Sequence, residues 1–317
     1  MATQKDLRIL FLGAAKRVSL LERFLDAAKK VDVRLQLFSC EATSGFYPIS
    51  HLASVLAGPG FMTDDFQLWI ASTVRQHSID IVIPNMDAAT VALSRYQSHN
   101  RGEACWAVVS DYDICEKMYD KVLATEFFHA TGIHCPPNTP DCYPKVLKPR
   151  FGFGARGIRV IHTSSQLAEL LRDDPNAYEV QDFIENFMET TVDIYVSRAG
   201  SLIGYVLRDR IEVSDGEVMV CRTRDASPDE ATLIEKVAAS GKWQGCITLQ
   251  YMTNPQGRYV VEINPRFGGG ATCGIEAGLD MPLYILSEFL GEPVCPPGAL
   301  RKLTMSRARR DFFYEHS

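Results

Sequence analysis

CITLQYMTNPQGRYVVEINPR, residues 246–266, predicts two β-strands, Ile247–Met252 and Gly257–Ile263, joined by a tight turn. β-branched and aromatic residues fill both arms, and the turn formers Asn, Pro and Gly lie between them. We centre the turn on Gln256, which makes the two arms antiparallel neighbours in a sheet. The register of this hairpin decides which side chains share a face.

One face of the hairpin is expected to be polar and the other apolar. With the turn at Gln256, Gln250 lies opposite Glu262 and Thr248 lies opposite Asn264, and side chains alternate between the faces. The polar face therefore carries Gln250, Glu262 and Asn264. The expected core face carries the apolar residues Ile247, Leu249, Tyr251, Val261 and Ile263.

The polar face presents one carboxylate and two amide oxygens close together. Hard oxygen ligands from a few residues suit Mg²⁺, which takes waters and phosphate oxygens at its remaining positions. Arg266 continues the same face and would place a cation beside the same phosphates. The alternative is an ordinary amphipathic hairpin whose polar face is simply solvated.

A glycine-rich loop precedes this hairpin by about a hundred residues. Gly152, Gly154 and Gly157 leave backbone N–H groups that can approach a phosphate closely, and Lys148 adds a positive charge just before them. No Gly-Lys-Ser/Thr follows and no helix opens there, so this is not a Walker A loop. The glycine spacing and the strand that follows also exclude a dinucleotide fingerprint. A mobile hairpin without a ligand is the alternative.

A third candidate segment, Glu179–Ile184, is followed by Glu189. The backbone of such a strand-to-strand connector can bind the edge of an adenine, and a carboxylate just beyond it can bind ribose hydroxyls. A solvated linker is the default alternative.

Strand and helix signals divide the chain into three parts. Residues 1–112 alternate strands and helices, which predicts a parallel sheet with right-handed crossovers. Residues 113–185 predict a small α+β lobe, and residues 186–317 predict mainly antiparallel strands. The expected strands of the first two parts are Leu7–Leu12, Arg34–Ser39, Ile79–Ile83, Cys105–Val109, Val146–Lys148, Ile158–Ile161 and Tyr178–Phe183, and the helix between them is Tyr119–Thr131.

Composition excludes several classes of protein. The 317 residues carry a formal net charge of −6, which disfavours nucleic-acid binding. The short basic cluster Arg307, Arg309 and Arg310 is interpreted as a solvated strand end. Nine scattered cysteines form no Cys-x-x-Cys pair and predict reduced thiols in a cytoplasmic protein. No apolar run approaches the length of a membrane span.

The order of these segments resembles the ATP-grasp superfamily of ligases, in particular the ATP-binding half of the carbamoyl-phosphate synthase large chain and its stand-alone relatives. The resemblance covers about residues 1–295, and its most specific piece is Val261-Glu262-Ile263-Asn264-Pro265-Arg266. It implies an α/β plus α+β fold, with a Rossmann-like N-terminal (pre-ATP-grasp) lobe at 1–112 followed by a two-lobed ATP-grasp domain. The small lobe with its lid would be 113–185, and the lobe with the metal site would be 186–317.

The resemblance also implies roles for individual residues. Arg266 and Lys148 would be catalytic, and the metal ligands for two Mg²⁺ ions, or Mn²⁺, would be Gln250, Glu262 and Asn264. ATP would be bound by Lys121, Lys148, Gly152, Gly154, Gly157, Gln181, Phe183, Ile184 and Glu189. Arg17, Arg208, Arg210 and Arg222 would help to form the substrate site.

Three positions depart from the family pattern. Many relatives have an acidic residue where Gln250 stands, and a Glu is common where Gln181 stands. One residue is inserted before Glu189, which leaves Glu185 as the less favoured partner of the ribose.

The expected function is an ATP-dependent carboxylate–amine ligase that forms an acyl phosphate, ADP and phosphate. Its partners would be a small carboxylate and an amine, with no nucleic acid and no membrane, and a homodimer is possible. A non-catalytic ATP-binding sensor is the alternative. A dehydrogenase is disfavoured, because Gly13-Ala14-Ala15-Lys16 lacks the glycines of a dinucleotide-binding turn.

Overall fold

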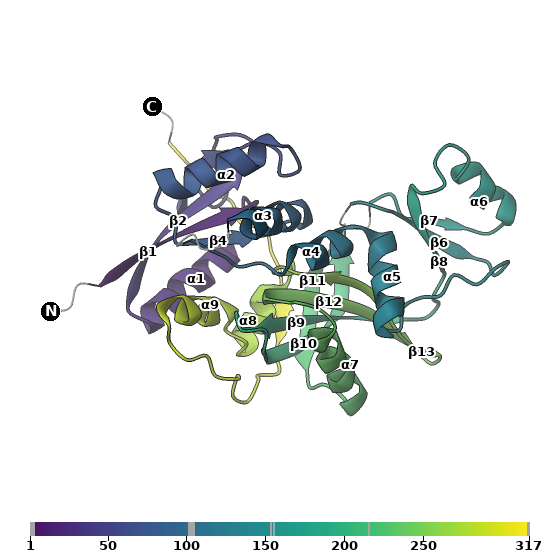
Figure 1. The fold of residues 1–317 in the computed structure, drawn as a ribbon. Helices are drawn as coiled ribbons and strands as arrows, with labels where there is room; N and C mark the ends of the chain where they lie inside the picture. Colours follow the sequence, from purple (N-terminus) through teal and green to yellow (C-terminus); the bar gives the residue numbers. More distant parts are fainter. Residues whose placement is uncertain (1–3, 101–104, 153, 155, 215, 316–317) are drawn as a thin grey trace.

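The computed structural model describes residues 4–100, 105–152, 154, 156–214 and 216–315. Its strands form three sheets, which follow one another from left to right in Figure 1. The parallel N-terminal sheet is at the left, a large antiparallel sheet lies in the centre, and a small antiparallel sheet with α6 stands at the right.

The N-terminal sheet has five parallel strands in the order β3-β2-β1-β4-β5. Its strands are β1 (Lys5–Leu12), β2 (Val33–Glu41), β3 (Ala53–Ala57), β4 (Ile81–Pro84) and β5 (Trp106–Ala107). Helix α1 (Val18–Lys30) covers one face, and α2 (Asp65–Gln76) and α3 (Asp87–His99) cover the other. The apolar run Ile9–Leu12 of β1 is fully buried, because a strand inside a parallel sheet is covered on both faces. The sequence missed β3, an edge strand with only one buried residue.

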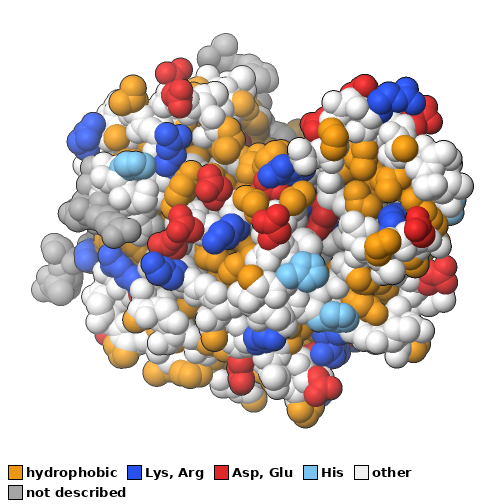
Figure 2. All heavy atoms as spheres, turned by 45° about the vertical axis from the view of Figure 1, so that its right-hand side comes forward, with side chains coloured by type: hydrophobic (Ala, Val, Ile, Leu, Met, Phe, Trp, Pro, Cys, Tyr) orange, Lys and Arg blue, Asp and Glu red, His pale blue; other side chains and the backbone are white. Residues whose placement is uncertain are grey.

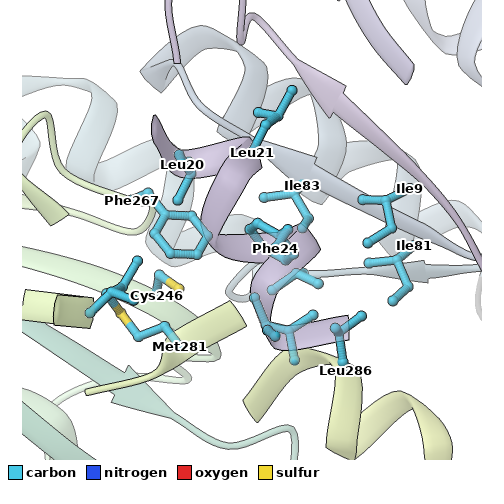
Figure 3. Packing of buried hydrophobic residues seen from close by; sticks show 14 of the residues in the cluster. Ile9, Leu20, Leu21, Phe24, Ile81, Ile83, Cys246, Phe267, Met281 and Leu286 are labelled. Atoms are coloured by element: carbon cyan, nitrogen blue, oxygen red, sulfur yellow. The ribbon is translucent and has the colours of Figure 1, made fainter. Parts of the chain in front are cut away.

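The N-terminal sheet shares its core with the last third of the chain. The ring of Phe24 in α1 packs edge-on against Phe11 of β1 and against Phe267, with centroids 5.1 and 5.9 Å apart. Figure 3 shows Cys246, Met281 and other residues of the C-terminal third around the same ring. This shared core holds the segment after Asn264 against the first helix.

The small sheet has the order β7-β6-β8, with β6 (Lys145–Pro149), β7 (Arg159–Ile161) and β8 (Tyr178–Asp182). Helix α6 (Ser164–Leu170) belongs to it. Before it, the chain forms two helices, α4 (Tyr112–Tyr119) and α5 (Lys121–Thr131), where the sequence predicted one. The break is at Asp120, whose carboxylate caps α5 by accepting hydrogen bonds from the N–H groups of Val122 and Leu123.

The central sheet is antiparallel, in the order β13-β12-β9-β10-β11-β14. Its strands are β9 (Met188–Val196), β10 (Leu202–Ser214), β11 (Glu217–Arg224), β12 (Gly245–Asn254), β13 (Gly257–Asn264) and β14 (Thr304–Ser306). Helix α7 (Pro228–Ala239) and α5 pack on one face. The helices α8 (Ala271–Ala277) and α9 (Met281–Leu290) lead back to the N-terminal sheet.

The predicted register of the β12–β13 hairpin is confirmed where the polar residues lie. Gln250 pairs with Glu262 and Thr248 pairs with Asn264. The turn itself was predicted one position off, since Asn254 pairs with Gly257, and a bulge beside Gln250 restores the register. The prediction that Val261 faces the core was wrong, because the bulge turns Val260 inward instead, leaving it 1% exposed.

Among the described residues, every helix is too short or too polar to cross a membrane. After β14 the chain returns to the N-terminal lobe, where the ring of Phe312 stacks on His51 and the Tyr314 hydroxyl donates to the carbonyl of Tyr47.

Candidate active site

Four of the predicted site residues, Lys121, Gly152, Glu262 and Asn264, line a cleft between α5, the small sheet and the β12–β13 hairpin. Figure 2 shows acidic and basic side chains gathered on this side of the molecule, below the notch beside the small lobe. The walls of the cleft include Lys121, Gly152, Glu179, Glu262 and Asn264, together with Asp87 from the N-terminal lobe. Segments far apart in the sequence therefore supply charged groups to one place.

Lys148 lies in a buried polar network at one wall of the cleft. Its Nζ donates to Oε1 of Gln181 at 2.7 Å and lies 4.0 Å from Oε2 of Glu179. Glu179 in turn accepts hydrogen bonds from Gln181 and Thr125. Burial lowers the pKa of Lys148, against the effect of the Glu179 and Glu262 charges, and burial raises the pKa of Glu179. An anionic ligand beside Lys148 would favour the charged form of the lysine.

The predicted adenine connector leaves this network at the end of β8. The backbone N–H of Phe183 donates to the carbonyl of Pro144 at 3.1 Å, so it is engaged within the small lobe. The Phe183 side chain is exposed and Ile184 is partly buried. The side chain of Gln181 is engaged by Lys148, so its place in an adenine pocket remains a prediction.

The glycine loop follows β6 and bends over α5. Lys121 Nζ donates to the carbonyl of Gly152 at 2.9 Å, which ties the predicted phosphate lysine to the loop. Gly152, Gly154 and Gly157 all have positive φ, where glycine is favoured. Gly154 touches the tip of the β10–β11 hairpin, since a Cβ on Gly216 would lie 2.8 Å from the Gly154 carbonyl carbon. Residues 153 and 155 of the predicted lid lie outside the described part of the chain.

The polar face of the hairpin offers a fitting place for one Mg²⁺. Glu262 and Asn264, two residues apart on β13, supply a carboxylate and an amide oxygen at the cleft wall. Within the described residues, no three His, Cys, Asp or Glu side chains form a metal-binding group, so phosphate oxygens and water would have to complete the shell.

Gln250, the third predicted metal ligand, has a cationic neighbour. Its Oε1 accepts a hydrogen bond from Nη1 of Arg210 at 3.2 Å, and the same Nη1 donates to Oε1 of Glu189 at 2.7 Å. Burial and the charge of Glu262 raise the pKa of Glu189, while Arg210 opposes them. Arg210, predicted as a substrate ligand, therefore stands between the predicted ribose and metal residues. This donor set does not fit a second Mg²⁺.

Arg266 spans the two lobes. Its guanidinium forms a bidentate ion pair with Asp87, at 2.6 and 3.0 Å, and also donates to the carbonyl of Phe267. Asp87 begins α3 at the carboxyl edge of the parallel sheet. The predicted catalytic arginine is thus held at the junction between the N-terminal lobe and the hairpin.

Two further arginines lie near Arg266. Arg17, just before α1, donates to the carbonyls of Phe267 and Gly268 at 3.2 and 2.9 Å. Arg307 donates to the next carbonyl, that of Gly269. Burial and the charges of Arg266 and Arg307 lower the pKa of Arg17 to about 10. Three guanidinium groups therefore gather around one short loop.

The other two predicted substrate arginines lie elsewhere. Arg208 is 1% exposed and makes a bidentate ion pair with Asp193, an equally buried partner. Arg222 pairs in register with Asp209, on the face of the sheet opposite to Arg208 and Arg210. These positions do not support a substrate role for either residue.

Sequence reasoning overlooked Glu179, Asp87 and Arg307. Glu179 faces Lys148 across the β6–β8 ladder, a signal that appears only once this pairing is known. Arg307 was interpreted as a solvated strand end, but its contact with Gly269 brings it beside the site.

The loop after β1 is closed to a dinucleotide phosphate. The carboxylate of Glu41, at the end of β2, accepts hydrogen bonds from the N–H groups of Ala14 and Ala15, and burial raises its pKa. These are the groups that a dinucleotide pyrophosphate would need, which agrees with the missing glycines.

Comparison with known proteins points to one superfamily. The family described as ATP-grasp in the biosynthetic pathway with Ter operon matches residues 180–308. The 3-methyl-D-ornithine–L-lysine ligase of Methanosarcina acetivorans is 23% identical over 222 residues, covering 68% of this chain and 58% of that protein. N5-carboxyaminoimidazole synthetase from Staphylococcus aureus, solved with ADP, superimposes with a TM-score of 0.74 over 96% of this chain and 83% of that one, at 15% identity. Residues 180–308 thus match an ATP-grasp family, and the chain shares the fold of the solved synthetase.

The carbamoyl-phosphate synthase likeness is found as well. The C-terminal section of the large chain from Aquifex aeolicus is 23% identical over 176 residues, covering 48% of this chain and 33% of that section. The chain spans less than two thirds of the length of the curated relatives it matches first. The structural likeness shows the fold of this chain, and the curated relatives show what its sequence resembles.

Proposed function

We propose that this ATP-grasp protein is an ADP-forming carboxylate–amine ligase. The observation that carries the proposal is the meeting of Lys121, the glycine loop, Glu262 and Asn264 at the walls of one cleft. A lysine and flexible backbone donors suit a polyphosphate, and the two oxygen ligands of β13 suit its Mg²⁺. The relative named for joining 3-methyl-D-ornithine to L-lysine supports amino acids as the first substrates to test.

The reaction would run in two steps. A substrate carboxylate oxygen attacks the γ-phosphorus of ATP, and the bond to the β,γ-bridging oxygen breaks, giving an acyl phosphate and ADP. An amine then attacks the acyl carbon, loses a proton and releases phosphate. Mg²⁺ held by Glu262 and Asn264 would neutralise charge on the phosphates. Such chemistry depends on in-line positioning and on positive charge around the moving phosphoryl group.

Protein groups would supply the rest of that positive charge. Lys148 and Lys121 would bind phosphate oxygens, and the loop Gly152–Gly157 would close over them and exclude water from the acyl phosphate. Glu189 would bind the ribose, with the adenine held by the backbone of residues 181–184. Arg266 would exchange its ion pair with Asp87 for the transferred phosphoryl group.

The substrate carboxylate would bind near the N-terminal lobe. Arg17 and Arg307 lie beside Arg266, and among the described residues Arg17 has carbonyl partners but forms no ion pair. In this proposal residues 1–112 are the Rossmann-like pre-ATP-grasp lobe, residues 113–185 are the lid-bearing lobe, and residues 186–317 are the metal-binding lobe. A cytoplasmic location and a homodimer stay predictions from the sequence.

The proposal is tested by isotope transfer. The protein is incubated with Mg-ATP, an amine panel and amino or dicarboxylic acids labelled with ¹⁸O in the carboxylate. We expect ADP release that depends on the acid, with one ¹⁸O appearing in the released phosphate. ADP without label in phosphate would rule out the acyl phosphate, and nucleotide binding without turnover would favour the sensor function.

A variant at the metal ligand sharpens this test. Glu262→Ala should lower ADP formation by about 10³-fold, because the Mg²⁺ that neutralises the phosphate charge would lose its carboxylate ligand. The melting temperature should change little, since Glu262 faces the cleft. Glu235→Ala, an exposed carboxylate on α7, is the matched control and should keep its activity. Equal activity of both variants would contradict the metal assignment.

A further inference from the structure

Arg210 occupies a central position on the site face of the central sheet. It lies on β10, and its guanidinium reaches across β9 to contact Glu189 of β9 and Gln250 of β12. The side chain of Arg210 is only 10% exposed and that of Glu189 is 23% exposed. The cation is therefore built into the site and is not a surface charge.

The place of this guanidinium conflicts with a metal ion at Gln250. Mg²⁺ would bind Oε1 of Gln250 at roughly 2.1 Å. That oxygen already accepts a hydrogen bond from Nη1 of Arg210 at 3.2 Å. A metal ion bound there would therefore be repelled by a nearby buried positive charge. Gln250 is neutral and offers no charge to compensate both cations. Its opposite residue, Glu262, is the one acid of this ladder pair.

Arg210 also has capacity to bind an anion. Its Nε–H is buried and has no partner among the described residues. Its Nη2 donates to the carbonyl of Gly216 at 3.0 Å, at the hairpin tip that touches Gly154 of the glycine loop. The guanidinium thus lies under the predicted lid, with a donor to spare for a phosphate oxygen.

We propose that Arg210 takes the place of a second divalent ion, so that the site binds a single Mg²⁺ at Glu262 and Asn264 and the guanidinium contacts the phosphates directly. The neutral amide of Gln250 fits this arrangement, because it can accept a hydrogen bond from Arg210 without carrying a charge. A carboxylate at position 250 would instead bind a divalent ion or form an ion pair with Arg210. The inference rests on the proposed function, because it assumes that a nucleotide binds in this cleft.

Counting bound ions tests the inference without any turnover. The protein is saturated with the non-hydrolysable analogue AMP-PNP and titrated with Mn²⁺, and free Mn²⁺ is followed by electron paramagnetic resonance. Nucleotide occupancy is measured in parallel with a fluorescent ATP analogue. We expect one tightly bound Mn²⁺ per bound nucleotide in the natural chain.

A paired substitution should convert the site to two ions. In Arg210→Gln/Gln250→Glu the guanidinium is removed and two carboxylates face each other across the ladder, so Mn²⁺ should rise from one to two per nucleotide. The single variant Gln250→Glu is the matched control and should stay at one, because Arg210 would pair with the new carboxylate. Glu262→Gln should bind less than one.

The outcomes separate this inference from the function it rests on. Two ions in the natural chain, with nucleotide bound, would overturn the inference and leave the ligase proposal standing. So would a double variant that binds nucleotide yet stays at one ion. Absence of nucleotide binding in the natural chain would overturn both proposals together.

Discussion

Arg208 and Arg210 stand two residues apart on one strand and on one face of the central sheet, yet their surroundings differ. Arg208 is 1% exposed and gives its Nε and Nη2 to the two oxygens of one carboxylate, that of Asp193. Arg210 divides its donors among a carboxylate, an amide and a backbone carbonyl, and keeps its Nε–H unused within the described residues. The first is a closed structural pair, and the second is an open cluster that suits a ligand.

The difference shows how one strand serves both the core and the site. The closed pair fills space beneath the glycines that follow Arg266, since a Cβ on Gly270 would lie 2.4 Å from Nη1 of Arg208. The open cluster lies farther along β10, where the tip of the hairpin meets the glycine loop. Stability should therefore depend mainly on the first arginine, and nucleotide chemistry on the second.

The largest effect is expected at the closed pair. Arg208→Met should lower the free energy of unfolding by about 3–5 kcal/mol, because it leaves the Asp193 carboxylate buried without a counter-charge. Urea unfolding measures the loss. The double variant Arg208→Met/Asp193→Leu should recover much of it, and a double variant as unstable as the single one would contradict this reading of the pair.

The open cluster should show the reverse behaviour. Arg210→Met should reduce ADP formation by about 10²-fold, as expected for loss of a donor to developing charge. The unfolding free energy should change by less than about 1 kcal/mol, because the partly exposed Glu189 can be rehydrated. Steady-state ADP release and urea unfolding on the same preparation check both halves. A loss of stability equal to that of Arg208→Met would contradict the distinction between a structural arginine and a ligand-binding one.

A third network, on the opposite face of the sheet, has a pH dependence that can be tested. Burial opposes the ionisation of Glu230, but hydrogen bonds from Arg224, Tyr251 and the Ser227 N–H prevail and lower its pKa from 4.5 to about 2. Its stabilisation is therefore present above pH 4.5 and is lost as the pH falls towards 2. Glu230→Gln should cost about 2 kcal/mol at pH 7. The difference in unfolding free energy between variant and natural chain should shrink between these two pH values, and a constant difference would contradict the assignment.

The smallest effect is expected at the contact between hairpin tip and lid. Gly216→Ala adds a Cβ at a φ of +78° and pushes against Gly154, so the loop should close less well. We expect a loss of about 1 kcal/mol in stability and roughly a tenfold higher KM for ATP. Gly200→Ala is the control, since its φ is +84° but nothing lies within 4 Å of the added carbon. The two variants should share the stability loss and differ in KM.

The pairing of side chains in the β12–β13 hairpin could be predicted because it depends on residues close together in the sequence. Period-two alternation and the turn residues placed Gln250 opposite Glu262 correctly, although the pairing next to the turn was one residue off and a bulge made up the difference. The bulge has no signature in the alternation, so Val261 was assigned to the wrong face. Helix α4 was missed altogether, whereas the predicted helix Tyr119–Thr131 begins two residues before α5, which starts at Lys121 after the Asp120 cap.

The sequence by itself determined the three-part order of elements, the polar hairpin face and the glycine loop, because each is set by residues close together in the chain. Only the tertiary structure decided that Arg266 pairs with Asp87, 179 residues away, that Arg208 is sealed in the core, and that Arg210 stands between Glu189 and Gln250. Those partners are chosen by strand order and by packing between lobes, which bring together side chains that no local pattern connects.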